Sequence, residues 1–234
     1  LSLSFHSMLK FVKNPYFLYL YGFVDFHTAD VISKKLQLPS SFSEKMQSYL
    51  YHILEEEYRN GKESIPVQSA VFELSYLLDV DEVIIENELN EVKGFHGKKR
   101  PFINEGKAYL AWVYFLKEKA LRIMRGNHPV EPPPEIEDPV IKQLLSNRYS
   151  ILTGGPGVGK TTVLRKIKDL LGERCIISAT TGKAAQNLGK DVVTIHTLLG
   201  YGPKGFSKRN LNCDVLALDE ASMLDWRTLY AVLQ

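Results

Sequence analysis

The sequence contains little cysteine, with Cys175 and Cys213 as the two among its 234 residues. They lie far apart, and no Cys/His spacing typical of a zinc site occurs. Two reduced thiols in or near a hydrophobic core are therefore predicted, in place of a disulfide framework or a metal centre.

Long apolar runs are also lacking. The run AYLAWVYFL at 108–116 is much shorter than the roughly 20 residues that a membrane-spanning helix needs. The first residues do not have the layout of a signal peptide. We expect a cytoplasmic protein with no membrane partner.

The chain has no strong excess of charge of either sign. Its formal net charge is +2, with 24% charged and 44% hydrophobic residues. This composition is typical of a globular protein and argues against disorder. Bulk charge does not indicate nucleic-acid binding, so any contact with DNA would depend on local placement of Lys and Arg.

An initiator methionine is absent, and the chain stops at Gln234, soon after a strongly patterned segment. We therefore expect a fragment of a longer protein. The clearest internal boundary is the Pro-rich and acidic segment GNHPVEPPPEIEDP. It predicts a mainly helical domain at 1–125, a linker at 126–138 and a second domain at 139–234.

The N-terminal part has helical periodicity. A helical hairpin is predicted at about 14–38, and a helical part with a small β wing at about 43–125. The segment FHGKKRPFI reads as the wing, with GKK at its turn, and a long helix is expected over 105–125.

The C-terminal part alternates between strand and helix patterns. Strands are predicted at 150–153, 174–179 and 215–219, and helices at 159–171 and over KAAQNL. Alternation of this kind predicts parallel βαβ units, so the expected fold class is α/β.

The segment GGPGVGKT, 154–161, matches the phosphate-binding loop pattern G-x-x-x-x-G-K-[ST]. Glycines let backbone N–H groups approach phosphate oxygens closely, and the following helix offers its positive N-terminus. Lys160 would reach the β- and γ-phosphates, and the Thr161 hydroxyl would ligate Mg²⁺. The predicted nucleotide-binding residues are Gly154, Gly155, Pro156, Gly157, Val158, Gly159, Lys160, Thr161 and Thr162.

An acidic pair follows the last predicted strand, in VLALDEAS. Asp219 would hold the Mg²⁺, and Glu220 would act as the general base that polarises the attacking water. Taken alone, the acidic pair is more simply interpreted as the solvent-exposed end of a strand. Beside a phosphate loop the pair favours an NTPase over a small-molecule kinase.

Two further segments lie between these motifs, SATTGKAAQNLG at 178–189 and VVTIHTLLG at 192–200. The first brings hydroxyls, amides and Lys183 to the sheet edge, where they could hold the phosphate backbone of a second ligand. A capped helix start explains the same residues without a ligand. His196 taken alone is most simply a structural histidine.

Together ILTGGPGVGKTT, SATTGKAAQNLG, VTIHTLLG and VLALDEASMLD resemble, in order and spacing, the first motifs of RecD-like helicases of superfamily 1. These motors move 5′ to 3′ on single-stranded DNA, some within exodeoxyribonuclease V. The segment NPYFLYLYGFVDFHTADVISKKLQLP is similar to the family's N-terminal helical hairpin. The resemblance implies a partial RecA-like P-loop NTPase domain after a helical domain.

The resemblance also implies ligands and roles. ATP and Mg²⁺ would bind at 154–162, and Asp219 and Glu220 would be the Walker B pair. Single-stranded or forked DNA would be the polymer partner, with other helicase–nuclease subunits as candidate partners. The implied DNA-side residues are Thr180, Thr181, Gly182, Lys183, Thr194 and His196.

Three departures from the family pattern limit these expectations. The glutamine that reads adenine is expected near Glu137, and Gln143 is out of register, so preference for ATP over GTP is not predicted. Asp25 stands where a DNA-binding hairpin prefers glycine, which leaves packing and DNA contact as equal interpretations of the hairpin. The second motor domain, with its arginine finger, would lie beyond Gln234.

We therefore expect nucleotide binding with little ATP turnover and no unwinding from these residues alone. A nucleotide-switched DNA-binding or adaptor module without motor activity is the alternative. Another P-loop ATPase, such as a loader, fits less well because of the T-I-H and DEASM strings.

Overall fold

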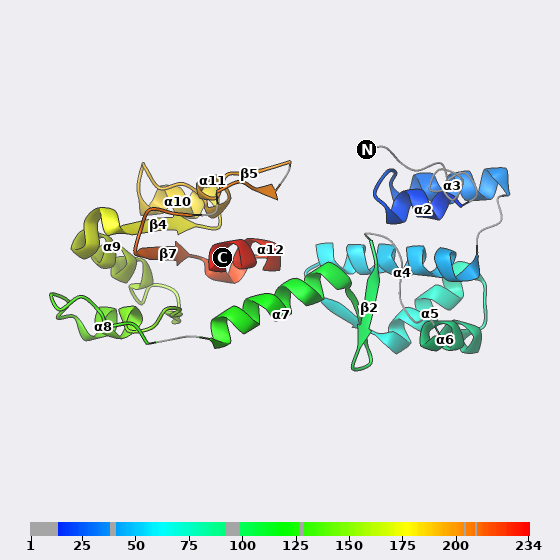
Figure 1. Cartoon of the computed structure of the whole chain (residues 1–234), viewed down its shortest axis with the longest axis horizontal. Coiled ribbons are helices and arrows are strands. Elements are labelled where there is room, and N and C mark those ends of the chain that lie inside the picture. Colours follow the sequence, from blue (N-terminus) through cyan, green and yellow to red (C-terminus); the bar gives the residue numbers. More distant parts are fainter. Residues whose placement is uncertain (1–13, 38–40, 92–98, 127–128, 204, 209) are drawn as a thin grey trace. The chain divides into compact units, whose positions relative to one another are not determined.

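The computed structural model describes residues 14–37, 41–91, 99–126, 129–203, 205–208 and 210–234. The chain divides into two compact units, 1–115 and 116–234, which we describe separately (Figure 1). The α/β class holds, with a mainly helical first unit and a small parallel sheet in the second. Across the described ranges, no helix combines the length and apolar character needed to cross a membrane.

The first unit begins with the expected helical hairpin. Helix α2 spans Pro15–Leu20 and helix α3 spans Phe26–Leu36, with Gly22 at φ +80° in the turn between them. Asp25 begins α3, because its carboxylate accepts hydrogen bonds from the Thr28 amide and hydroxyl at 2.7 and 2.9 Å. Asp25 is thus a helix cap, which gives this acidic residue a local structural role.

Helix α4, Phe42–Arg59, is the centre of the first unit, since α2, α5 and all three strands of the sheet contact it. Ser41 caps the helix through the Glu44 amide, and Asn14 of the hairpin donates a hydrogen bond to the Glu44 carboxylate. The core around α4 consists of side chains with almost no exposure, among them Tyr16, Tyr19, Leu20, Met46, Leu50, Leu74, Ile85 and Leu110.

The antiparallel sheet of this unit has the order β1-β3-β2, formed by Ser64–Pro66, Lys107–Leu110 and Pro101–Asn104. The wing predicted at FHGKKRPFI lies partly in 92–98, outside the described residues, and its last three residues, 101–103, belong to β2. The observed hairpin turns at Glu105 and Gly106, which have φ of +48° and +70°. Positive φ at both central residues suits a tight two-residue hairpin turn.

The expected helix over 105–125 is consequently wrong at its start, because α7 spans Ala111–Arg125. Residues 107–110 form a strand that pairs on one side with β1 and on the other with β2. An apolar run of this length fits either a buried strand or a helix, and pairing on both sides selects the strand.

Two further helices complete the first unit, α5 at Val67–Leu78 and α6 at Glu82–Glu91. Pro66 stands directly before α5, and the Asp81 carboxylate accepts from the Val83 amide at the start of α6. Asp79 ends α5 in the left-handed conformation, with φ +54°.

A partly buried carboxylate, that of Asp30, links the helical hairpin to α4. The hydroxyls of Tyr16 and Tyr49 both donate to Asp30 Oδ1, at 2.8 and 2.7 Å, and Lys34 pairs with Oδ2 at 2.6 Å. Burial alone would raise the pKa of Asp30, but the bonds from Lys34, Tyr49 and Tyr16 lower it overall. Burial beside this carboxylate raises the pKa of Tyr16 to about 12.

Asp30→Asn should loosen the hairpin by about 1–3 kcal/mol, the usual worth of hydrogen bonds to a charged acceptor. Folding lowers the pKa of Asp30 below 3.8. The stability that wild type has over Asp30→Asn is therefore complete above about pH 4 and decreases at lower pH. Hydrogen exchange of α4 amides at pH 6 and pH 3 measures both effects, with exposed Asp169→Asn as the control. Equal protection in wild type and Asp30→Asn at pH 6 would contradict this role.

The second unit contains the parallel pair β4, Cys175–Ala179, and β7, Val215–Asp219, which run in register from Cys175↔Val215 to Ala179↔Asp219. Two of the three predicted strands, and the parallel pairing expected of them, are thereby confirmed. Helices α8 (Pro139–Leu145) and α9 (Lys160–Leu171) share a core with the two strands. That core consists of Ile136, Ile141, Ile167, Leu171, Cys175 and Ala217.

The remaining elements of this unit are short and flank β4 and β7 in the sequence. Helix α10 (Gly182–Leu188) packs on β4 through small side chains, and α11 covers Ile195–Leu198. A short hairpin, β5 (Tyr201–Gly202) and β6 (Gly205–Phe206), precedes β7. Turns of 3-10 helix lie at Gly172–Arg174 and Ala221–Met223, and α12 covers Trp226–Leu233.

The strand predicted at 150–153 is not formed. These residues have no regular structure and pair with none of the described strands, and Ile151 is 75% exposed. A parallel strand forms only where a neighbouring strand takes up its backbone hydrogen bonds. In the described part of the chain β4 and β7 pair with each other, and neither pairs with residues 150–153. Of the Pro-rich segment 126–138, Ile136 belongs to the core of the second unit. The linker itself stays a prediction.

Candidate functional site

The phosphate-loop pattern occupies the turn before α9. Gly157 and Gly159 adopt φ of +76° and +90°, a backbone that other residues reach only at a cost. At Gly154, an added Cβ would lie 2.8 Å from a Val158 methyl group. The glycines are thus required by the shape of this loop, which turns its backbone into the first turn of α9.

Lys160, the first residue of α9, folds back over the loop. Its ammonium donates to the carbonyl oxygens of Gly154 and Gly155, both at 2.7 Å. The side chain is therefore held across the mouth of the loop by two backbone acceptors. The ammonium group therefore lies where an anion bound by the loop could replace the two carbonyls as its hydrogen-bond acceptor.

Thr161 and Asp219 meet although 58 positions separate them in the sequence. The Thr161 hydroxyl donates to Asp219 Oδ2 at 3.2 Å, which joins the start of α9 to the end of β7. A hydroxyl and a carboxylate are both oxygen ligands of the kind that Mg²⁺ takes, together with phosphate oxygens and water.

Glu220 follows Asp219 in a left-handed conformation, with φ +54°. Its amide donates to Asp219 Oδ1 at 2.9 Å, and its carbonyl accepts from the Met223 amide at 3.0 Å. The two adjacent carboxylates are thereby directed differently, one toward Thr161 and the other toward the end of β4. The sequence does not reveal this turn, because a left-handed glutamate has no sequence signature.

Two threonines at the end of β4 contact Glu220. Thr180 donates to the Glu220 carbonyl at 3.1 Å, and the Thr181 hydroxyl donates to Glu220 Oε2, also at 3.1 Å. The Thr181 hydroxyl oxygen also accepts from the Ala184 amide at 3.2 Å, so it caps α10. A segment predicted to face nucleic acid is therefore bonded to the residue predicted to activate water.

Gly182 and Lys183 form the first turn of α10 and are exposed. Thr194 caps α11, accepting from the Thr197 amide at 3.3 Å, and forms a bridge with Ala179 at the end of β4. The structure therefore brings Thr180, Thr181 and Thr194 to the same sheet edge as the acidic pair.

His196 lies in different surroundings from the acidic pair. Its ring packs against Tyr201 and Phe206 of the β5–β6 hairpin, with centroids 5.4 and 6.0 Å away, and its Nε2 lies 3.2 Å from the Thr228 hydroxyl. These contacts join α11, the hairpin and α12, which agrees with the simpler reading of His196 as a structural histidine.

Sequence reasoning missed two buried polar residues that support this region. Thr228 is almost fully buried and meets His196, and Ser178 donates to the Val193 carbonyl at 2.7 Å. Asp225 accepts from the Thr228 amide at 2.7 Å, so an Asp-x-x-Thr helix start was a usable signal for Thr228. Ser178 has no such signal, because its role depends on a partner fifteen residues away.

The residues present fit a nucleoside triphosphate with a divalent cation. The loop offers backbone donors and Lys160 a cation, while Thr161 and Asp219 offer oxygen ligands. The part of the chain that the structure describes has no cluster of three or more His, Cys, Asp or Glu that could hold a metal. A cation here would thus need oxygens from its ligand, as Mg²⁺ bound to phosphates does.

Comparison with known families matches residues 137–234 to a model described as an AAA domain. Over 148 residues the chain is 36% identical to the ATP-dependent RecD2 DNA helicase of Deinococcus radiodurans, covering 51% of this chain and 21% of that protein. It is 36% identical over 114 residues to the RecBCD enzyme subunit RecD of Buchnera aphidicola, covering 35% and 19%.

A eukaryotic relative is more distant. The ATP-dependent DNA helicase PIF1 of Candida albicans is 32% identical over 109 residues, covering 38% of this chain and 12% of that protein. The chain spans about a fifth of the length of the bacterial relatives.

Proposed function

We propose that the protein is an ATP-dependent DNA helicase moving 5′ to 3′. The premise of this proposal is that the chain is RecD-like over the first motor domain. The observation that carries this proposal is the chain of contacts from Thr161 to Asp219, and from Glu220 to Thr180 and Thr181. It links the phosphate loop, the acidic pair and the predicted DNA-side segment at one edge of the sheet.

In this function ATP lies along 154–162, with Lys160 transferring its hydrogen bonds from the loop carbonyls to the β- and γ-phosphates. Thr161 and Asp219 would hold a Mg²⁺ ion on the protein side, which would supply charge neutralisation. Glu220 accepts a proton from water as the water oxygen attacks the γ-phosphorus and the bond to the β-phosphate oxygen breaks. Lys160 stabilises the charge left on the phosphates.

Single-stranded DNA would contact the exposed start of α10, where the Gly182 amide and the Lys183 ammonium are suited to backbone phosphates. Thr180, Thr181 and Thr194 would line the same edge, with hydroxyls as donors. His196 would act in this function by holding the adjoining hairpin against α12. Other helicase–nuclease subunits remain candidate partners, by analogy with the RecBCD subunits among the relatives.

The decisive experiment compares residues 1–234 alone with the same residues followed by a second motor domain, here called the longer or full-length protein. Residues 1–234 should bind an ATP analogue but hydrolyse ATP slowly, because an arginine finger from a second domain is worth roughly 10³–10⁵ in rate in related NTPases. The longer protein should show ATPase activity stimulated by single-stranded DNA. Full stimulated turnover from residues 1–234 would refute the need for a second domain.

Two other outcomes of that experiment are informative. Nucleotide-dependent DNA binding by the longer protein with no stimulated turnover would favour the switch or adaptor function. Parallel titrations with ATP and GTP decide base preference, for which the position of Glu137 gives no guide.

The Thr181 bond to Glu220 leads to a prediction about coupling. While the Thr181 hydroxyl donates to Oε2, the carboxylate is a weaker acceptor for the proton of the attacking water. A DNA phosphate that takes over this hydroxyl would free Glu220. Thr181→Val should therefore raise ATP turnover without DNA by about 2- to 10-fold and reduce stimulation by DNA, on the usual worth of one hydrogen bond.

Thr181→Ser is the matched control, since it keeps the hydroxyl and the helix cap and should behave as wild type. Steady-state ATPase with and without single-stranded DNA, together with the KM for ATP, gives the readout. A Val variant with unchanged basal turnover and unchanged stimulation would exclude coupling through this bond.

A further inference from the structure

Helix α5 of the first unit exposes aromatic side chains on the face that points away from the core. Its inner face is buried through Ala70, Val71, Leu74 and Leu78. On its outer face Phe72 is 68% exposed and Tyr76 is 82% exposed. Helices with apolar side chains on both faces are normally covered on both. The outer face of α5 is thus unusual for a surface helix.

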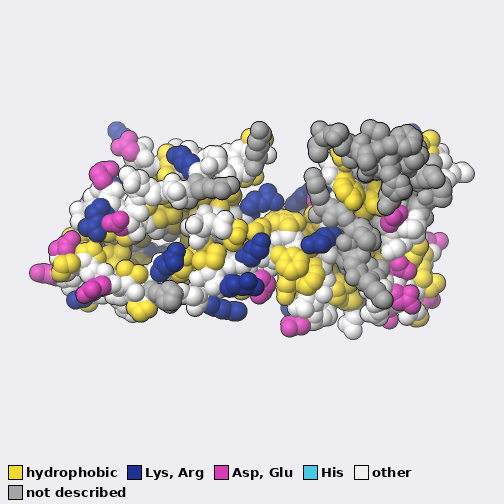
Figure 2. Space-filling view, in the orientation of Figure 1, with side chains coloured by type: hydrophobic (Ala, Val, Ile, Leu, Met, Phe, Trp, Pro, Cys, Tyr) yellow, Lys and Arg dark blue, Asp and Glu magenta, His cyan; other side chains and the backbone are white. Residues whose placement is uncertain are grey.

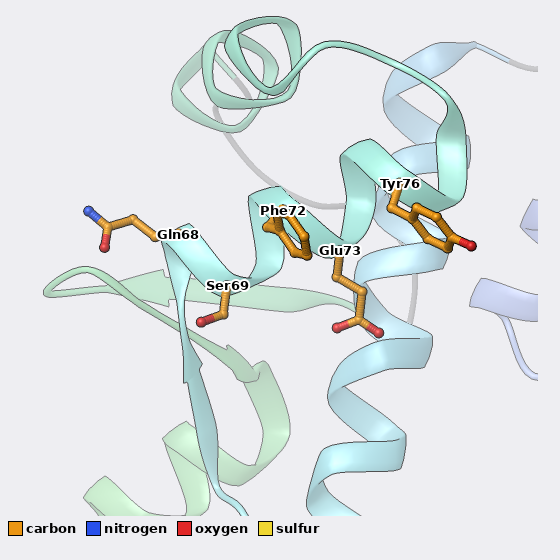
Figure 3. A pocket seen from close by; sticks show the side chains of 5 residues that line it. All are labelled: Gln68, Ser69, Phe72, Glu73 and Tyr76. Carbon is orange, nitrogen blue, oxygen red and sulfur yellow. The ribbon is translucent and has the colours of Figure 1, made fainter.

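The exposed aromatics border a shallow hollow of about 560 Å³, lined by Gln68, Ser69, Phe72, Glu73 and Tyr76. Figure 3 shows these side chains projecting from one stretch of α5. Phe72 and Tyr76 are one helical turn apart, so their rings are neighbours on the helix surface. Val83 and Ile84 of α6, the helix that packs on α5, are exposed as well. Apolar patches of this kind on soluble proteins often mark contact sites.

The charge of the segment that contains the hollow is predominantly negative, although Lys62 pairs with Glu57 there. Residues 55–91 contain eleven Asp or Glu and two Lys or Arg, a net charge of −9 in a chain whose total is +2. Figure 2 shows Asp and Glu side chains gathered over α5 and α6. A DNA backbone would be repelled by this surface, so it is not an extension of the predicted DNA side.

Glu73 shows that negative charge is concentrated at the hollow itself. Partial burial raises the pKa of Glu73, and the nearby carboxylates of Glu57 and Glu56 on α4 raise it further, while Lys62 opposes them. Carboxylates that repel each other are stabilised by an added cation. A positive group entering the hollow would relieve this repulsion.

We propose that the outer face of α5 is a docking surface for a basic amphipathic segment of a partner protein. Arg or Lys side chains of the partner pair with Glu73 and stack on the rings of Phe72 and Tyr76, while its apolar side chains fill the hollow. Guanidinium groups suit both contacts, because they form charge-assisted bonds to carboxylates and lie flat on aromatic faces. Aromatic residues and Arg are also the residue types that interfaces favour.

This surface lies within the first unit, and the proposal holds whether or not the nucleotide site hydrolyses ATP. The test begins with random peptides displayed against the full-length protein. Peptides that also bind the Phe72→Ala/Tyr76→Ala variant are removed. The peptides that remain should combine Arg or Lys with apolar residues. Enrichment of acidic or uncharged peptides, or of none, would overturn the proposal.

The most enriched peptide is then synthesised with a fluorescent label and titrated by anisotropy. Phe72→Ala and Glu73→Gln should each weaken its binding about 5- to 30-fold, as loss of an interface anchor does. Higher salt should weaken binding to wild type more than binding to Glu73→Gln. Val140→Ala and Glu173→Gln, exposed residues of the second unit, serve as controls with unchanged affinity.

Sedimentation distinguishes a partner from a second copy of the chain. Concentration-dependent dimers that disappear in Phe72→Ala/Tyr76→Ala would assign the face to self-association and overturn the proposal. Both substituted side chains are exposed, so these variants should unfold at the wild-type temperature. If Phe72→Ala and Glu73→Gln each bind the peptide as tightly as wild type does, the peptide does not use these contacts and the proposal is overturned.

Discussion

Replacing Lys160 with alanine should lower ATP turnover of the full-length protein by about 10²–10³-fold, the range for loss of one charged or polar group that stabilises the transition state. Lys160 is the cation at the mouth of the phosphate loop, held there by the carbonyls of Gly154 and Gly155. Its loss leaves the negative charge that develops on the phosphates without a partner. Affinity for a fluorescent ATP analogue should fall as well.

The fold should survive this substitution, because the Lys160 ammonium bonds to two loop carbonyls and Lys160 is not part of the core of the second unit. Thermal unfolding of the variant checks this point. Lys190→Ala, an exposed lysine of the same unit, is the matched control and should keep full activity. Wild-type turnover in Lys160→Ala would exclude the phosphate-loop assignment.

Glu220→Gln should separate binding from hydrolysis. The amide keeps the size of the side chain and can still accept from Thr181, but it is no base for the attacking water. We expect ATP turnover to fall by about 10²–10⁴-fold, the usual contribution of a general base, with nucleotide affinity within a few-fold of wild type. Single-turnover hydrolysis and equilibrium binding measure the two quantities.

A matched acidic control is available earlier in the same unit, directly after α9. Glu173→Gln changes an exposed carboxylate in the 3-10 turn after α9 and should leave both quantities unchanged. If Glu220→Gln instead loses nucleotide affinity while hydrolysing what it binds at the normal rate, the residue has a binding role. Asp219 would then be the better candidate for the base.

The helices and the acidic strand end were predictable because their signals are local. Apolar spacing, Ser41 before α4, Pro66 before α5 and Asp138 before α8 give helix positions from neighbouring residues. The apolar run that becomes β7 also ends in its acidic pair without help from distant residues.

Strand assignments failed where pairing decides them. Residues 107–110 looked like the start of a helix, and pairing with β1 and β2 makes them a strand. Residues 150–153 looked like a strand, and they pair with none of the described ones. A ladder needs a neighbour at the right distance and register, which no local pattern contains.

By itself, the sequence determined the phosphate loop, the acidic pair and their likeness to RecD-like helicases, because these features depend on residue type at short spacing. Only the tertiary structure decided that Thr161 meets Asp219 and that Thr181 meets Glu220. It also decided that Phe72 and Tyr76 face outward beside Glu73. Contacts between residues about 40 or more positions apart, and the exposed face of a helix, follow from packing of the whole unit.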